Sequence, residues 1–141
     1  QLSVVPRFSK AMRTPIARVL SEYPADFVGL CYDSGHGNMS GDGLEQLAAY
    51  SDRLIAVHLH DNDGSGDQHM LPFMGTLDWG RLAELIAASG YEKWANLEVS
   101  QSASGYEDDE EAFLHEALTI AGRLNDDIAR ARAAHTEEQS R

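Results

Sequence analysis

Three short apolar runs of this sequence end in side chains that can bind a metal ion or move a proton. Asp33 and His36 close the first run, His58 lies in the second and Glu98 in the third. Taken singly, each would be read as a polar strand end that faces water. Together, carboxylate oxygens and an imidazole nitrogen form a mixed donor set suited to Mn²⁺, Zn²⁺, Co²⁺ or Mg²⁺. The sequence therefore predicts one divalent metal bound by Asp33, His58 and Glu98.

A long polar segment, residues 61–77, follows the second run and holds further candidates. It exceeds the usual length of a connection between a strand and a helix, which indicates function. Its Asp67 and His69 are expected to bind a second metal, to orient the ligand residues or to shape the loop. His60 and Asp61 are expected to hydrogen-bond to the ligand residues from behind.

Two further side chains are candidates for contact with a substrate. His36 is expected to donate a hydrogen bond to the substrate, with a metal-ligand role or a plain loop position as alternatives. Trp79 follows a helix-capping Asp78 and is a candidate wall of the substrate pocket. Cys31 is expected to face the interior and has no evident base beside it, so it is interpreted as a packing residue.

The elements that must position these residues alternate between strand and helix. Parallel strands are predicted over residues 27–32, 54–60 and 94–99. Helices are predicted from Thr14–Pro15 onward and over residues 44–50, 78–90 and 107–133. Because side chains alternate along a strand, one face of each strand is apolar and Asp33, His58 and Glu98 share the other. This pattern predicts an α/β fold with a parallel sheet and outer helices.

The chain length limits how much of a barrel can be present. A full (β/α)8 barrel needs about 250 residues, whereas 141 residues supply three or four strand–helix units. We therefore expect the C-terminal half of a TIM barrel over residues 1–135 and a frayed tail over 136–141. Open sheet edges in such a half predict self-association into a homo-oligomer.

Composition narrows the classes of partner. The net charge is −12, and such a surface repels phosphate backbones, so a small molecule is favoured over nucleic acid. The single cysteine excludes an internal disulfide and suits a reducing cytoplasm. No apolar run approaches the roughly 20 residues of a membrane span.

The run from residue 28 to residue 99 resembles the xylose isomerase-like TIM barrel family of sugar phosphate isomerases and epimerases. The segments YDSGH, VHLHDNDGSGDQH, PFMGTLDW and LEV carry the resemblance. It implies one divalent metal held by Glu, Asp, His and Glu, of which Asp33, His58 and Glu98 match the last three. The first Glu would precede Gln1, and His36 matches a substrate-contacting histidine. PFMG departs from the PGxG of many members.

The resemblance implies isomerisation or epimerisation of a sugar or sugar phosphate. A metal that chelates adjacent carbonyl and hydroxyl oxygens acidifies the C–H bond between them and stabilises an enediolate. Glu98 would then be both a ligand and the base that removes and returns the proton. The catalytic candidates are accordingly Glu98 and His36.

Two other functions stay open at this point. Apurinic-site nucleases of the endonuclease IV type share the pattern, with the zinc-ligand positions Asp33, His36, His58, Asp67, His69 and Glu98. The acidic charge disfavours that nuclease, because a surface that clamps DNA should be basic. The third reading is an inactive half barrel or an interaction module, which the missing Glu favours.

Overall fold

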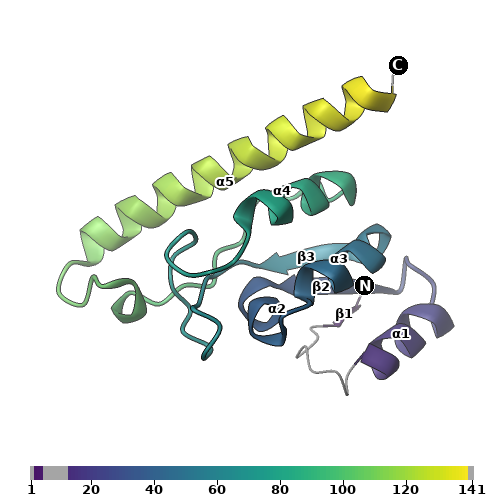
Figure 1. The fold of residues 1–141 in the computed structure, drawn as a ribbon, viewed down its shortest axis with the longest axis horizontal. Helices are drawn as coiled ribbons and strands as arrows, with labels where there is room; N and C mark the ends of the chain where they lie inside the picture. Colours follow the sequence, from purple (N-terminus) through teal and green to yellow (C-terminus); the bar gives the residue numbers. More distant parts are fainter. Residues whose placement is uncertain (1, 5–12, 140–141) are drawn as a thin grey trace.

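The sheet at the centre of the fold has three parallel strands. The computed structural model describes residues 2–4 and 13–139. Strands β1 (Leu2–Val4), β2 (Val28–Asp33) and β3 (Leu54–His58) lie in that order across the sheet (Figure 1). Both pairings are parallel, which confirms the prediction for residues 27–32 and 54–60. Strand β1 lies in a segment for which the sequence predicted no element.

Five helices are described around this sheet. They are α1 (Arg13–Glu22), α2 (Ser34–Ser40), α3 (Gly43–Ala49), α4 (Trp79–Ala88) and α5 (Glu110–Gln139). Short 3-10 turns occupy Ser51–Arg53 and Ser102–Ser104. Helix α2 lies in a glycine-rich stretch where none was predicted. Helix α5 extends through residues 136–139, which were expected to fray, while residues 140–141 lie outside the described part.

The hydrophobic core fills the space between the sheet and the two C-terminal helices. Figure 1 shows α4 lying between α5 and the sheet. The core includes Leu30 and Leu59 from the strand side, Leu82 from α4 and Leu124 from α5, all at most 2% exposed. Burying each such side chain contributes about 1.5–3 kcal/mol, so this packing fixes the sheet edge that carries the site.

A β-bulge changes the phase of β3. Leu30 pairs with Leu54, but Cys31 pairs with Ala56, so Ile55 is the extra residue. Strict alternation along residues 54–60 predicts Ile55 on the apolar face with Val57 and Leu59, and the bulge overturns that prediction. Leu54 joins the core instead, and Ile55 lies so close to Gly29 that a Cβ there would meet it at 2.6 Å.

The third predicted strand, residues 94–99, does not form a regular strand. A single parallel bridge joins Leu59 to Leu97, with hydrogen bonds from Leu59 N to Asn96 O (2.8 Å) and from Glu98 N to Leu59 O (3.1 Å). The backbone N–H of Ala95 instead donates to the side chain of Asn125 on α5, at 3.2 Å. Trp94 is 80% exposed and has no place on the inner face.

Among the described helices, none has the length and apolarity that crossing a membrane requires.

Candidate functional site

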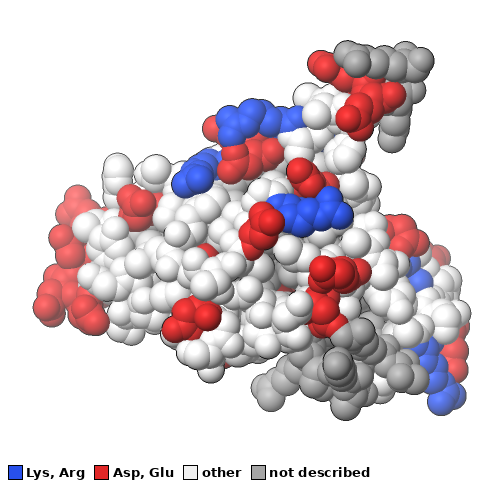
Figure 2. Space-filling model, viewed as in Figure 1, with Lys and Arg blue, Asp and Glu red and all other residues white. Residues whose placement is uncertain are grey.

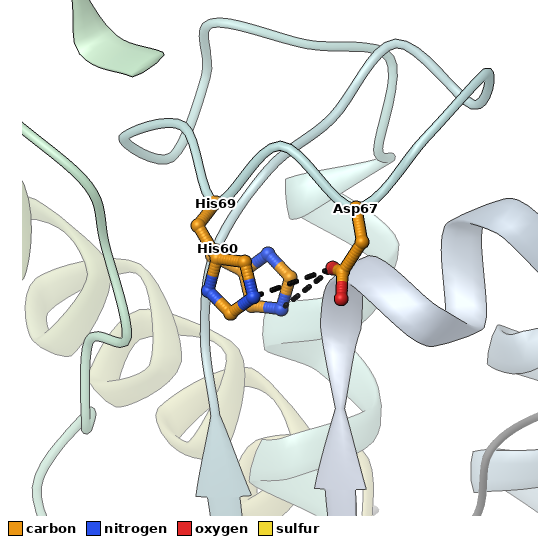
Figure 3. Close-up of side chains that lie close together, drawn as sticks. All are labelled: His60, Asp67 and His69. Carbon is orange, nitrogen blue, oxygen red and sulfur yellow. Dashed lines mark ion pairs between the residues drawn. The ribbon is translucent and has the colours of Figure 1, made fainter. Parts of the chain in front are cut away.

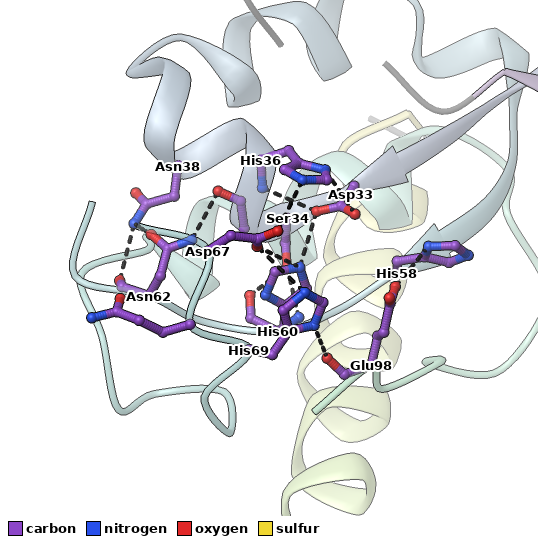
Figure 4. Close-up of polar contacts among 12 residues, drawn as sticks. Asp33, Ser34, His36, Asn38, His58, His60, Asn62, Asp67, His69 and Glu98 are labelled. Atoms are coloured by element: carbon purple, nitrogen blue, oxygen red, sulfur yellow. Dashed lines mark hydrogen bonds and ion pairs between the residues drawn. The ribbon is translucent and has the colours of Figure 1, made fainter. Parts of the chain in front are cut away.

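Asp33, His58 and Glu98 meet at the carboxyl end of the sheet (Figure 4). Asp33 and His58 are direct partners in the β2–β3 register, and Glu98 follows the bridge residue Leu97. One donor atom from each of the three lies within 4.8 Å of the others. The Nδ1 atom of His58 is 2.8 Å from Oε2 of Glu98. Two carboxylates and one imidazole at this spacing fit a divalent cation about 2.1 Å from each donor.

The burial of the three side chains differs in a way that suits a metal site. Asp33 is 3% exposed, while the side chains of His58 and Glu98 are about one third and one half exposed. A buried carboxylate is rigid and stays charged only with partners. The two more exposed donors leave the site open to small molecules from the solvent.

Asp33 is held by the helix that follows it. It is the N-cap of α2, and its Oδ1 accepts a hydrogen bond from the backbone N–H of His36 at 3.0 Å. The first turn of α2 therefore brings the His36 ring over the carboxylate, with Nδ1 3.1 Å from Oδ2 of Asp33. The other ring nitrogen, Nε2, lies 3.2 Å from Oδ2 of Asp67. His36 thus lies between two carboxylates.

His60 supports Asp33 from inside the protein. It is fully buried, and its Nε2 is 3.1 Å from Oδ1 of Asp33. Ser34 fixes the His60 backbone, since its hydroxyl donates to the His60 carbonyl (2.6 Å) and accepts from the His60 N–H (2.9 Å). Only glycine fits at position 35, because a Cβ would lie 2.0 Å from Cε1 of His60. His60 thus contacts Asp33 from the buried side, and its role behind a metal ligand stays a prediction.

A second group of donors is formed by His60, Asp67 and His69 (Figure 3). The two imidazole rings stack with centroids 3.9 Å apart. Nε2 of His69 lies 3.4 Å from Oδ1 of Asp67, and Nδ1 of His69 lies 2.7 Å from the carbonyl oxygen of Glu98. A carbonyl only accepts, so Nδ1 carries the proton and, in the neutral ring, Nε2 offers a lone pair. His69 also has φ of 57°, a strained backbone region that occurs at functional sites.

Asp61 and Trp79 belong to neither donor group. Asp61 is fully buried and accepts hydrogen bonds from Trp79 Nε1 at 2.7 Å and from the backbone N–H groups of Asn62 and Leu77. Asp61 therefore shapes the loop and does not support a ligand residue directly. Trp79 is buried in the core at 6% exposure, so its expected place as a wall of the substrate pocket is corrected.

Two polar residues near the site were missed by reasoning from the sequence. Ser34 is one, and Asn38 is the other, whose side-chain N–H₂ donates to Asn62 Oδ1 and to Thr76 Oγ1, both at 2.9 Å. These bonds tie α2 to the long loop. The DSGH motif contains Ser34, but nothing in the sequence pairs Asn38 with residues 24 and 38 positions away. Cys31 is buried, and burial with nearby Asp33 and Glu98 raises its pKa to about 11, so it remains a neutral thiol.

The Asp33–His60 contact predicts a pH dependence of stability. Burial alone would raise the pKa of Asp33, but hydrogen bonds from the His60 ring and the His36 backbone hold it below its usual 3.8. Burial alone would lower the pKa of His60, but Asp33 raises it above its usual 6.5. The Asp33 contribution is lost as pH falls through its lowered pKa, and the His60 contribution is lost as pH rises through its raised pKa. Stability of the metal-free protein should therefore be greatest from about pH 4 to 6.5.

Urea unfolding with a chelator present, repeated across pH, measures this profile. His60→Gln should remove the loss of stability on the alkaline side, while His115→Gln, an exposed histidine on α5, should leave the profile unchanged. Identical alkaline slopes for the wild type and His60→Gln would contradict the prediction.

Comparison with known proteins identifies the fold and the family. The sequence profile of the family described as "Xylose isomerase-like TIM barrel" matches residues 13–120. A solved D-tagatose 3-epimerase-like protein superposes with a TM-score of 0.55 at 21% identity, over 86% of this chain and 47% of that one. At this identity the superposition establishes the fold alone.

Related sequences are longer than this chain. An uncharacterized protein of Sinorhizobium fredii is 44% identical over 117 residues, which is 82% of this chain and 37% of the relative. An uncharacterized protein of Mycobacterium tuberculosis is 38% identical over 68 residues, 46% of this chain and 24% of the relative. The chain thus spans well under half of these relatives, as expected for part of a TIM barrel. With a matched region from residue 13 to residue 120, the chain belongs to the xylose isomerase-like TIM barrel family.

Proposed function

We propose that this chain carries the metal-binding part of a divalent-metal-dependent sugar or sugar-phosphate isomerase or epimerase. The observation that carries the proposal is the meeting of Asp33, His58 and Glu98 donor atoms within 4.8 Å at the carboxyl end of a parallel sheet. TIM barrel enzymes place their active sites at this end of the strands. Membership of the xylose isomerase-like family supports the same class of chemistry.

The metal would be held by Asp33, His58 and Glu98, and Mn²⁺, Zn²⁺, Co²⁺ and Mg²⁺ all accept such donors. When bound, a divalent cation supplies Lewis acidity toward the carbonyl and hydroxyl oxygens of a sugar. The half-exposed Glu98 carboxylate removes a proton from the carbon beside the carbonyl group and returns it.

His36 is the best-placed donor to a substrate. Its side chain is about one-fifth exposed, and its ring lies between Asp33 and Asp67. Those carboxylates orient the ring. Its Nε2 atom, which contacts Asp67, therefore needs only a small movement to donate to a sugar hydroxyl instead. His36 would bind and orient the substrate while Glu98 moves the proton.

Metal binding is the direct test of the proposal. Thermal unfolding of the chain should shift upward with Mn²⁺, because a ligand that binds only the folded state at one hundred times Kd stabilises it by about 2.7 kcal/mol. His58→Ala removes the only nitrogen donor of the three and should abolish most of this shift. His115→Ala, an exposed histidine of α5, serves as the matched control. Equal shifts for the wild type and His58→Ala would refute the assigned site.

A second function is favoured by the second donor group. His60, Asp67 and His69, with His36 beside them, add donors beyond those that one metal needs. This arrangement favours a multi-zinc apurinic-site nuclease of the endonuclease IV type. The charge opposes it: Glu107–Glu111 are exposed acids, and Figure 2 shows acidic side chains gathered where α5 begins. Such a surface repels a DNA backbone.

Metal stoichiometry and a cleavage assay separate the two functions. Native mass spectrometry with added Zn²⁺ should show one tightly bound ion, and duplex DNA with an abasic site should stay intact. Two or more bound ions together with cleavage would establish the nuclease. A chain that binds no metal at all would support the inactive half barrel or interaction module. Self-association of copies and a cytoplasmic location stay predictions from the sequence.

A further inference from the structure

We propose that Arg123 of α5 is a positioning residue. It holds the long loop between β3 and α4 in place by packing against the ring of Phe73. The loop carries Asp67 and His69. The Nδ1 atom of His69 contacts the backbone carbonyl oxygen of Glu98. Helix α5 would thus act on the candidate metal centre without contributing a donor to it. The effect on metal binding rests on the proposed function, whereas the contact itself does not.

The aromatic ring of Phe73 contacts two side chains. The guanidinium carbon of Arg123 is 3.6 Å from the ring centroid, which is cation–π geometry. The Phe73 and Trp79 rings have centroids 5.4 Å apart and are tilted by 49°. The indole N–H of Trp79 in turn donates to Asp61. A continuous series of contacts therefore runs from α5 into the core of the loop.

The backbone of Phe73 indicates that this ring position is held by its surroundings. Its φ is 73°, in the left-handed region that glycine occupies readily and an aromatic residue rarely does. A bulky residue keeps such a conformation only where its neighbours over-determine it. The contacts with Trp79 and Arg123 supply that constraint, so losing Arg123 should loosen residue 73 first.

Movement at Phe73 would reach the candidate centre through a short stretch of backbone. Met70 pairs with Asp61 through two hydrogen bonds, of 2.8 and 2.9 Å, and Leu71 N donates to the Ser104 hydroxyl at 3.0 Å. His69 directly precedes this bridge, and its Nδ1 lies 2.7 Å from the Glu98 carbonyl oxygen. The loop therefore sets where the Glu98 backbone lies.

The Arg123 guanidinium can stay over the Phe73 ring because its ion pair with Asp127 is weak. Its side chain is 61% exposed, and its Nε lies 3.9 Å from Oδ2 of Asp127. Arg130 is the closer partner of that aspartate. Arg130 thus shares the helix, the residue type and the acidic neighbour of Arg123, whereas the cation–π contact with Phe73 is made by Arg123. Replacing Arg130 is a matched control.

The test uses the full chain with Trp94→Phe, which leaves Trp79 as the only tryptophan. Arg123→Ala should make Trp79 fluorescence more accessible to acrylamide in the absence of metal and should weaken Mn²⁺ affinity about two- to fivefold. Arg123→Lys should show smaller changes than Arg123→Ala in both quenching and Mn²⁺ affinity, since an ammonium group also binds an aromatic face. Arg130→Ala should change neither.

A double-mutant cycle shows whether Arg123 acts through the ring. In a Phe73→Leu background, Arg123→Ala should have no further effect on either measurement. The proposal is overturned if Arg123→Ala behaves like Arg130→Ala, or if its effect persists undiminished in Phe73→Leu. Absence of Mn²⁺ binding by the unmutated chain would defeat the proposed function, while the fluorescence measurement would still decide on the contact.

Discussion

Replacing Glu98 with glutamine should lower the turnover of a sugar substrate by about 10²- to 10⁴-fold, the usual contribution of a general base. Glutamine keeps an oxygen donor at the same position, so binding of metal and substrate should change much less than turnover. The half-exposed Glu98 side chain already lies 2.8 Å from His58 Nδ1, within the donor cluster that it shares with Asp33. A loss in kcat with little change in KM is the mark of an interaction made in the transition state.

Under the proposed function, steady-state kinetics with a sugar or sugar-phosphate substrate provide the measurement. Glu92→Gln, at an exposed glutamate after α4, should leave both kcat and KM unchanged. Unaltered turnover in Glu98→Gln would remove Glu98 from the role of base, even if it remained a metal ligand.

The second large effect is expected at Asp61, where a substitution should cost stability. Asp61→Ala removes the acceptor of three hydrogen bonds inside a fully buried site. Each buried donor left without a partner costs about 1–3 kcal/mol, so the free energy of unfolding should fall by about 3 kcal/mol or more. Asp61→Asn keeps one accepting oxygen and should recover part of this loss.

Urea unfolding followed by circular dichroism measures the change. Asp63→Ala is the control, because Asp63 lies on the same loop but is exposed and accepts only from nearby loop groups. If Asp61→Ala and Asp63→Ala were equally stable, the buried hydrogen bonds of Asp61 would not hold the loop together.

The sequence predicts the strands β2 and β3 and the convergence of Asp33 with His58, because both depend on local patterns. An apolar run followed by a polar ligand-type residue identifies a buried parallel strand that ends at a site. Direct pairing of Asp33 with His58 in the register agrees with that interpretation. The family resemblance is confirmed by the match to residues 13–120.

Features that depend on distant contacts are not predictable in this way. The bulge at Ile55 requires knowing which residue of β2 stands opposite, and the exposed position of Trp94 requires knowing how residues 94–99 lie against β3. From its place in the sequence, Trp79 resembles an aromatic residue of a substrate pocket. In the structure its indole N–H donates to the buried carboxylate of Asp61. Helix α2 is missed because its four polar and two glycine residues have weak helix propensity, which the Asp33 cap offsets.

The position of α5 in the chain has a consequence for biosynthesis. The candidate donors all lie between residues 33 and 98, whereas the helix that covers α4 and reaches Phe73 begins at Glu110. Ribosomes add about 5–20 residues each second, so donor side chains leave the exit tunnel a few seconds before α5 is complete. During that interval the apolar surface of α4 is uncovered and the loop lacks its contact with Arg123. The final geometry of the loop and of the candidate donors therefore waits for the residues of α5.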